Sequence, residues 1–400
     1  MYDVIIVGAG ASGCFLALTL KYKNPNLRVL LLEKNDKLGK KILITGNGRC
    51  NIGNKNIKID DYSSNSSLDN LKALIESGSD NYASLLKEFG VLMTNEEDRL
   101  YPYSNQALTV CKSFERALLN YGVEIMYNYD VNTIDKKNDT FIINNEKRSK
   151  MVVIATGGKT YPKTGSTGKG YELLKSFGHS ITKLYPSLTS LKTNYKYIKD
   201  LAGVRVNAKV SLYENDDLIT EENGQLQFTK DSLSGICVFN LSRYACKMLE
   251  HKNLFIKVDY TPDKEADELY NYIKSFSNYT IEEAISCMLN NKLAKVISKD
   301  LKLEGKKVTN LTNNDLTKVV NIIKDMTFKV TSIGDFDVSQ VTSGGASLEE
   351  FTDNLESKKC KGLYAVGEVL DVDGKCGGYN LSWAFNSAII VCDDINKNTI

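Results

Sequence analysis

The fold is decided near the N-terminus, where residues 3–13 read DVIIVGAGASG and residues 29–33 read VLLLE. The apolar run before Gly8 predicts a buried strand, the segment after Gly13 a helix, and residues 29–32 a second strand. Gly8 permits the tight turn, Gly10 lets a pyrophosphate approach the backbone, and Gly13 lets the helix pack closely on the strand. The stretch therefore predicts a β-α-β unit that binds a dinucleotide.

The acidic residue at the end of the second strand indicates which nucleotide is bound. Glu33 lies twenty residues beyond Gly13, where a carboxylate can accept hydrogen bonds from the hydroxyl groups of a ribose. The preceding helix offers its free N–H groups and positive dipole end to the phosphates. An adenosine ribose without a 2′-phosphate is implied. This unit alone does not decide whether the bound dinucleotide is NAD or FAD.

Composition excludes several classes of protein. The chain has 400 residues, 42% hydrophobic content and a formal charge of +2, so it can bury a large core and form more than one domain. Its nine cysteines include no CxxC pair, and its two histidines lie far apart, which favours reduced thiols and no metal site. No apolar run matches a membrane helix or a signal peptide. We expect a cytoplasmic protein.

The end of the chain favours FAD. Residues 151–158 read as a buried strand whose end carries Thr156 and Gly157. Residues 361–368 read as another buried strand, which ends in Gly367 and Glu368. A helix opens at Gly377–Leu381. A cofactor domain that is completed by the C-terminus is expected for FAD. No second complete glycine-motif unit follows, so we expect the glycine-rich loop at 161–170 to fold against the first cofactor.

The middle of the chain reads as an insertion. Residues 204–213 alternate between apolar and polar side chains, which is typical of a strand with one buried face, whereas residues 264–327 show helical periodicity. Asp98–Ser104 is predicted to be a rigid turn. The predicted fold is α/β: a Rossmann-like FAD-binding domain (1–188 plus 335–400) with an inserted antiparallel β-barrel (189–262 plus 328–334) and a small helical domain (263–327).

Several longer motifs together resemble the BaiN/RdsA-type bacterial flavoprotein family, and the match covers essentially the whole chain. They are the glycine turn at 8–13, GKKI…TGNGRCN at 39–51, ATGG…YP…GSTG at 155–168, QVTSGG at 340–345 and GEVLDVDG…GGYN at 367–380. The resemblance implies FAD, a glutathione-reductase-type Rossmann domain, an inserted barrel and a helical domain. It also implies reduction of an activated C=C bond.

The cofactor-binding residues follow from these motifs and from the resemblance. Gly46 and Gly48 indicate a backbone that passes close to a ligand. The resemblance implies pyrophosphate contacts at Gly8, Gly10, Ala11, Ser12 and Gly13, and a ribose contact at Glu33. The remaining predicted contacts are Lys34, Gly46, Gly48, Arg49, Cys50, Val131, Thr156, Gly157, Gly367, Glu368, Gly378, Tyr379, Asn380 and Leu381.

The predicted activity is an FAD-dependent reduction in which hydride comes from flavin N5 and a proton from an acid that the sequence does not identify. The candidates for that acid are Cys50, Arg99, Tyr161 and Tyr379. NAD(P)H is expected as a transient electron donor. No metal and no stable protein partner are indicated.

The sequence allows two classes of substrate. One is a planar, steroid-like small molecule. The other is a uridine in ribosomal RNA, for which the six lysines of the Lys292–Lys307 segment could contact phosphates, although lysines on the wet face of a helix are ordinary. An amine oxidase and a non-catalytic flavin-binding protein are lower alternatives.

Overall fold

The computed structural model describes residues 1–399 and separates the chain into two compact units. The first contains residues 1–185 together with the segment from Gln340 onward, and the second contains Pro186–Ser339. These borders lie a few residues from the predicted ones at 188 and 335. Strand β11 (Tyr185–Ser187) spans the first border. The further division of the insertion into two domains stays a prediction.

A parallel sheet forms the centre of the first unit, and its order is β7-β2-β1-β10-β19. In register, Val4 of β1 lies beside Val29 of β2 and Met151 of β10. Residues 4–7, 29–32, 151–154 and 363–365 are buried, so the central part of the sheet reads as apolar runs in the sequence. The five strands are β1 (Tyr2–Val7), β2 (Val29–Leu32), β7 (Glu124–Met126), β10 (Lys147–Ile154) and β19 (Leu363–Ala365). An antiparallel hairpin of β8 (Ile134–Lys137) and β9 (Thr140–Ile143) pairs with the start of β10.

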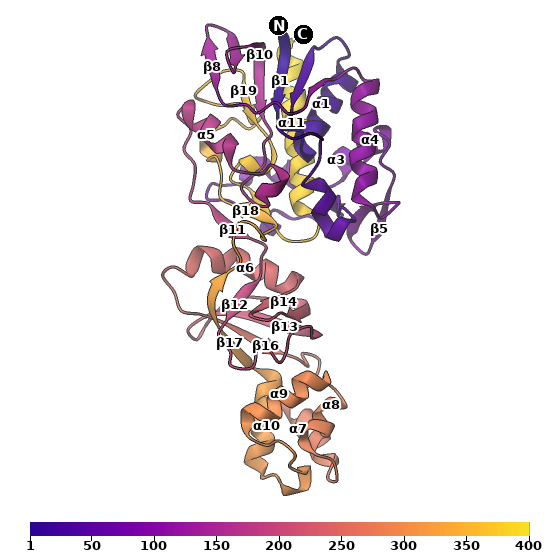
Figure 1. The fold of residues 1–400 in the computed structure, drawn as a ribbon, viewed down its shortest axis with the longest axis vertical. Coiled ribbons are helices and arrows are strands. Elements are labelled where there is room, and N and C mark those ends of the chain that lie inside the picture. Colours follow the sequence, from indigo (N-terminus) through magenta and orange to yellow (C-terminus); the bar gives the residue numbers. More distant parts are fainter. Residues whose placement is uncertain (400) are drawn as a thin grey trace. The chain divides into compact units, whose positions relative to one another are not determined.

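Two helices from opposite ends of the chain pack together beside this sheet. They are α1 (Ala11–Lys23), which follows the glycine turn, and α11 (Tyr379–Thr399), which lies along it in Figure 1. The C-terminal segment thus completes the N-terminal unit, as expected for an FAD domain. The other helices of the unit are α2 (Lys72–Glu76), α3 (Asp80–Glu88), α4 (Ala107–Asn120) and α5 (Lys169–Ser176). Its 3₁₀ turns are η1 (Ile42–Gly48), η2 (Ile59–Asp61), η3 (Asp69–Leu71), η4 (Pro162–Thr164), η6 (Leu348–Glu350) and η7 (Gly367–Val369).

A small antiparallel sheet corrects one prediction. The segment predicted as a rigid turn at Asp98–Ser104 contains strand β6 (Arg99–Pro102), which pairs with β3 (Gly53–Asn54) and β5 (Met93–Glu96). The tight turn lies earlier, at residues 97–98, where Glu97 has a φ of 53°. Residues 93–102 read MTNEEDRLYP, which shows neither a continuous apolar run nor apolar–polar alternation, so no sequence signal marks this hairpin. The remaining strands are β4 (Tyr62–Ser63), β18 (Val341–Ser343) and β20 (Asp373–Gly374).

The second unit contains the predicted barrel. Six antiparallel strands close in the order β12-β15-β14-β13-β16-β17, which removes every exposed sheet edge. Along β16 buried and half-buried residues alternate strictly, as expected for a wall with one inward face. The strands are β12 (Leu191–Thr193), β13 (Arg205–Glu214), β14 (Asp217–Phe228), β15 (Ser232–Ser234), β16 (Leu254–Asp259) and β17 (Met326–Ile333), and helix α6 (Ile236–Met248) packs on β14.

Four amphipathic helices leave the barrel after β16 and return to it at β17. In α9 the buried residues Leu293, Val296 and Ile297 follow helical spacing. The hydroxyl of Thr312 accepts a hydrogen bond from Asp315 N and caps the N-terminus of α10. Helices and barrel share one continuous apolar core. The elements are α7 (Ala266–Ser275), α8 (Ile281–Ser286), α9 (Asn291–Leu301), η5 (Val308–Asn310) and α10 (Asn313–Lys324). Within residues 1–399, no helix combines the length and the apolar character that crossing a bilayer requires.

Candidate functional site

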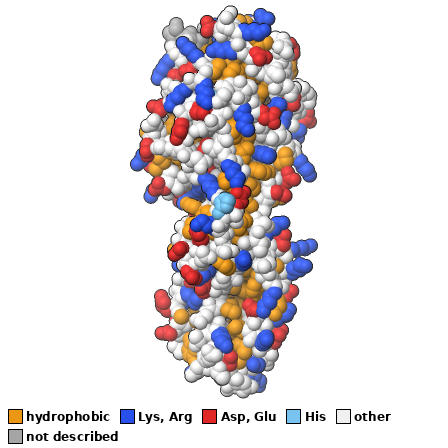
Figure 2. Space-filling model, turned by 90° about the vertical axis from the view of Figure 1, so that its left-hand side faces the viewer, with side chains coloured by type: hydrophobic (Ala, Val, Ile, Leu, Met, Phe, Trp, Pro, Cys, Tyr) orange, Lys and Arg blue, Asp and Glu red, His pale blue; other side chains and the backbone are white. Residues whose placement is uncertain are grey.

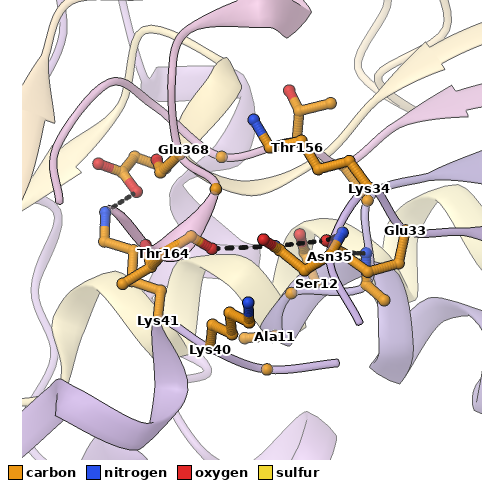
Figure 3. Close-up of a pocket in the computed structure, with 18 of the residues that line it drawn as sticks. Ala11, Ser12, Glu33, Lys34, Asn35, Lys40, Lys41, Thr156, Thr164 and Glu368 are labelled. Carbon is orange, nitrogen blue, oxygen red and sulfur yellow. Dashed lines mark hydrogen bonds and ion pairs between the residues drawn. The ribbon is translucent and has the colours of Figure 1, made fainter. Parts of the chain in front are cut away.

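A pocket lies in the first unit at the carboxyl ends of β1, β2 and β10 (Figure 3). Ligands of open α/β sheets bind at this edge, where strands end and helices begin. Residues from the first turns of α1, α5 and α11 line it: Ala11 and Ser12, Lys169, and Asn380 and Leu381. Three helix N-termini, each with unpaired N–H groups, therefore border one pocket.

The glycine turn leaves room where a cofactor would need it. A Cβ on Gly8 would lie 2.6 Å from the carbonyl oxygen of Ala155, and one on Gly13 would lie 1.9 Å from that of Gly8. Both glycines are therefore required by packing. A Cβ on Gly10, in contrast, would meet nothing within 4 Å, and Gly10 caps α1 without a side-chain hydrogen bond. The open space and the free helix end fit a pyrophosphate.

One end of the pocket is formed around Glu33, which is buried. Its Oε2 accepts a hydrogen bond from Ala9 N at 2.9 Å, and its Oε1 accepts two from Asn35, at 2.9 Å from N and 2.6 Å from Nδ2. All three donors are neutral. The glycine-rich loop folds onto this end, because Asn35 also donates to Thr164 O (Figure 3). Lys34 Nζ donates to Thr167 Oγ1 of the same loop. The expectation that residues 161–170 serve the first pocket is thus supported.

Another part of the pocket wall is formed around Glu368. Its Oε2 lies 2.7 Å from Lys41 Nζ, and its Oε1 accepts a hydrogen bond of 2.8 Å from Thr342 N. Thr160 Oγ1 lies 2.8 Å from Lys41 Nζ and 3.4 Å from Glu368 Oε1. Four segments that are far apart in sequence meet at this carboxylate. We call Lys41, Thr160, Thr342 and Glu368 the Glu368 cluster.

Two residues of the pocket lining carry buried hydroxyl groups. Thr156 Oγ1 and Ser166 Oγ have no hydrogen-bond partner within residues 1–399, and both residues line the pocket. A Cβ on Gly170 would lie 1.9 Å from Thr156 Oγ1, so this hydroxyl lies against the backbone of helix α5. The space beside Gly10 and the free N-terminus of α1 show that the pocket fits the implied dinucleotide.

The structure brings twelve of the predicted cofactor residues into this lining. They are Gly8, Gly10, Ala11, Ser12, Glu33, Lys34, Val131, Thr156, Gly157, Glu368, Asn380 and Leu381. Eight others lie outside it: Gly13, Gly46, Gly48, Arg49, Cys50, Gly367, Gly378 and Tyr379. Two of these act through packing, since a Cβ on Gly378 would lie 2.3 Å from Gly53 O and one on Gly13 would strike Gly8 O. Their contact with a cofactor stays a prediction.

Arg49 and the four candidate proton donors also lie outside the lining. The guanidinium of Arg49 contacts Glu96 and Asn105 and lies over the ring of Tyr101. Burial raises the pKa of the Cys50 thiol to about 12 and raises the pKa of Tyr161. Arg99 lies in β6 and Tyr379 begins α11. No group of these four is singled out as the acid.

Sequence reasoning missed several lining residues, among them Asn35, Lys41, Thr164, Ser166 and Gln340. Lys41 and Gln340 stand in the quoted motifs at 39–51 and 340–345 but were not named as cofactor contacts, and Asn35 carries no local pattern. The motif GSTG at 165–168 was the one available signal for Ser166. Within residues 1–399 no disulfide joins any of the nine cysteines, and no three His, Cys, Asp or Glu side chains are placed to hold a metal.

The fold and the pocket define the class of protein: an oxidoreductase built on an FAD-type Rossmann domain. The model of the HI0933-like protein Rossmann domain matches residues 2–394, and the chain belongs to this family. The predicted family, fold class and kind of enzyme are thereby confirmed.

Relatives of known activity span nearly the whole chain. It is 31% identical over 398 residues to 3-dehydro-bile acid delta(4,6)-reductase of Clostridium scindens, covering 96% of this chain and 97% of that one. It is 26% identical over 404 residues to the ribosomal RNA dihydrouridine synthase of Haemophilus influenzae, covering 98% of each.

A solved structure, 3-ketosteroid delta1-dehydrogenase of Sterolibacterium denitrificans, has a similar fold. Its TM-score is 0.51 at 11% identity, and 99% of each chain is covered.

Proposed function

We propose that the protein is an FAD-dependent reductase of an activated C=C bond in a planar, steroid-like substrate. The observation that carries this proposal is the pocket at the sheet edge, bordered by three helix N-termini and by the carboxylates of Glu33 and Glu368. The bile-acid reductase, at 31% identity over nearly the full length, supports the substrate class.

Each part of the pocket wall has a role in this proposal. The end of α1 and the space at Gly10 hold the pyrophosphate, and Glu33 accepts hydrogen bonds from the adenosine ribose. Asn380 and Leu381 bring the N-terminal N–H groups of α11 to the pocket, where the dipole of this helix favours negative charge. FAD, when bound, supplies the hydride. Cys50, Arg99, Tyr161 and Tyr379 stay candidates for the proton donor.

The test uses the purified protein loaded with FAD and reduced under anaerobic conditions. Addition of a steroid with a 3-oxo-4-ene group should reoxidise the flavin, seen by absorbance, and the product should gain two hydrogens by mass spectrometry. If the steroid left the flavin reduced and only the later admission of oxygen reoxidised it, the proposal would be contradicted. Reduction with NADH and with NADPH in parallel tests the proposed nicotinamide donor and shows which one serves.

Formation of dihydrouridine in ribosomal RNA is the second candidate. The relative of 26% identity supports it, and five of the six lysines of the Lys292–Lys307 segment have no ion-pair partner within residues 1–399. One of these five, Lys292, donates to the backbone carbonyl of Ala202, and the sixth lysine, Lys299, lies 3.2 Å from Asp200. Basic and acidic side chains are interspersed over the face shown in Figure 2, which gives no broad basic surface there. Salt-dependent binding of rRNA fragments, with dihydrouridine in the product, would favour this candidate over the first.

A further inference from the structure

We propose that Asn35 is a positioning residue that couples Glu33 to the glycine-rich loop at 161–170, so that a ribose bound at Glu33 holds this loop closed over the nucleotide. The inference rests on the proposed cofactor and adds a conformational step to its binding. Asn35 and residues 164–167 line the pocket, and Asn35 belongs to none of the motifs from which the cofactor contacts were predicted.

One side-chain amide of Asn35 holds both Glu33 and the loop. An amide nitrogen has two N–H donors. Asn35 Nδ2 lies 2.6 Å from Glu33 Oε1 and 3.1 Å from Thr164 O, so each donor has its own acceptor (Figure 3). The backbone of Asn35 is fixed as well, because its N–H donates to Glu33 Oε1 and its carbonyl accepts a hydrogen bond from Asn128 N. The amide therefore cannot turn away from one partner without losing the other.

The loop lies directly against residues 34 and 35. A Cβ on Gly165 would lie 2.5 Å from Asn35 Nδ2 and 3.1 Å from Lys34 Cε, so the loop backbone touches both side chains. Lys34 Nζ also donates to Thr167 Oγ1 at 3.0 Å. Movement of the loop away from the pocket would break all of these contacts.

A ribose would bind to the same carboxylate that Asn35 holds. Within residues 1–399 Glu33 accepts one hydrogen bond from Ala9 N and two from Asn35, and a carboxylate offers about four acceptor positions. The remaining position suits a ribose hydroxyl. A hydroxyl bound there restrains Glu33, which restrains Asn35, which in turn restrains the loop. Because such coupling is reciprocal, the closed loop also strengthens the binding of the ribose.

The test uses two nucleotides that differ only in the ribose hydroxyls. Flavin-free protein is saturated with ADP or with 2′,3′-dideoxy-ADP, and hydrogen exchange of the loop is followed by mass spectrometry. The N–H groups of residues 164, 165 and 167 donate to carbonyls inside the loop, so their exchange reports its opening. In the wild type, exchange should be about two- to tenfold slower with ADP than with dideoxy-ADP, the size of one hydrogen bond between neutral groups.

Two variants act on the link from opposite sides. Asn35→Ala removes the amide, and Gly165→Ala places a Cβ against Asn35 Nδ2 from the loop. In both variants the two nucleotides should protect the loop equally. Asn26→Ala, which changes an exposed asparagine outside the pocket lining, should keep the wild-type difference. A merely structural role of Asn35 would lower the melting temperature of Asn35→Ala and leave the difference between the nucleotides intact.

Equal protection by the two nucleotides in the wild type, or a difference that persists in folded Asn35→Ala, would overturn the inference. If Asn35→Ala does not fold, the same comparison in Gly165→Ala decides. Stopped-flow fluorescence adds a second measurement, in which FAD should dissociate about tenfold faster from Asn35→Ala than from Asn26→Ala, and equal rates would also overturn the inference. If the wild-type protein bound neither ADP nor FAD in calorimetry, the proposed cofactor would fail instead.

Discussion

The two carboxylates that line the pocket are held in opposite ways. Glu33 receives its hydrogen bonds from Ala9 and Asn35, neutral donors within one β-α-β unit. Glu368 receives its contacts from Lys41, Thr160 and Thr342, which are brought together only by the folded chain. The Glu33 end is thus a local structure that exists once two strands and a helix form. The Glu368 cluster depends on the C-terminal segment returning after the insertion.

The largest expected effect concerns the local unit itself. Gly13→Ala places a Cβ 1.9 Å from Gly8 O, a backbone atom that cannot move without distorting the turn. Overpacking of this kind typically costs about 1–3 kcal/mol, and more where backbone must shift. We expect most of the variant to be insoluble, with a lowered melting temperature for the remainder. A stable variant that binds FAD normally would contradict the close packing of α1 on β1.

The next effect separates the two carboxylates. In Glu33→Gln an amide N–H₂ would face the N–H donors of Ala9 or Asn35, and leaving such buried groups unsatisfied costs about 1–3 kcal/mol. Stability to urea should fall, and the Kd values for FAD and ADP should rise together. Glu368→Gln should weaken FAD binding and leave ADP binding unchanged. If both variants affected ADP equally, the two ends would not serve different halves of one ligand.

A smaller effect is expected for Gly10→Ala, which matches Gly13→Ala in chemistry but not in surroundings. Its Cβ would meet no protein atom within 4 Å, so the melting temperature of the flavin-free protein should stay near that of the wild type. The methyl group would occupy the space proposed for the pyrophosphate. Affinity for both FAD and ADP should therefore drop roughly tenfold or more, as expected for one overpacked methyl group. Unchanged affinity would place the pyrophosphate elsewhere.

The smallest effect is a pH dependence of stability from a cluster beyond the end of α5. His179 is buried, its Nε2 lies 2.7 Å from Ser357 Oγ, and its Nδ1 lies 3.1 Å from Glu350 Oε2. Ser357 Oγ also accepts hydrogen bonds from the N–H groups of residues 359 and 360, which suits a neutral imidazole with its proton on Nδ1. Burial lowers the pKa of His179, against the opposing effect of Glu350, while Lys359 lowers it further.

The sign of the pH effect follows from this shift. Because the folded pKa of His179 lies below the unfolded value of 6.5, the unfolded chain binds more protons as the pH falls below 6.5. The free energy of unfolding should therefore decrease between pH 7 and pH 5, and this decrease should be weaker in His179→Gln. The affinity of the folded protein for its cofactor should not change with this titration, since the His179 cluster does not line the pocket. If the free energy of unfolding of His179→Gln depended on pH as strongly as that of the wild type, the pH effect would belong to other groups.

The contrast between the two carboxylates also explains what could be predicted from the sequence. The β1-α1-β2 unit and Glu33 were predicted because each glycine has a local reason and the spacing to the acid is short. The barrel was predicted from the period-two pattern at 204–213, and the helices from their apolar spacing. These features depend on neighbours in sequence.

The rest depends on tertiary contacts that leave no local trace. Lys41 looks like an exposed loop lysine until Glu368, 327 positions later, lies beside it. Arg49 was expected at the cofactor, but the hairpin of β5 and β6 places Glu96 within its reach. The polar loop at 161–170 could be assigned to the pocket only as an expectation, and its contacts with Lys34 and Asn35 required the fold.

The most direct test of a two-ended cofactor pocket is equilibrium binding of FAD, ADP and FMN to the flavin-free wild-type protein. If the two ends of the pocket hold the two halves of one cofactor, FAD should bind with one-to-one stoichiometry and a Kd well below those of ADP and FMN. An ADP affinity equal to that of FAD would show that only the Glu33 end binds the cofactor. Such a result would contradict the two-ended pocket.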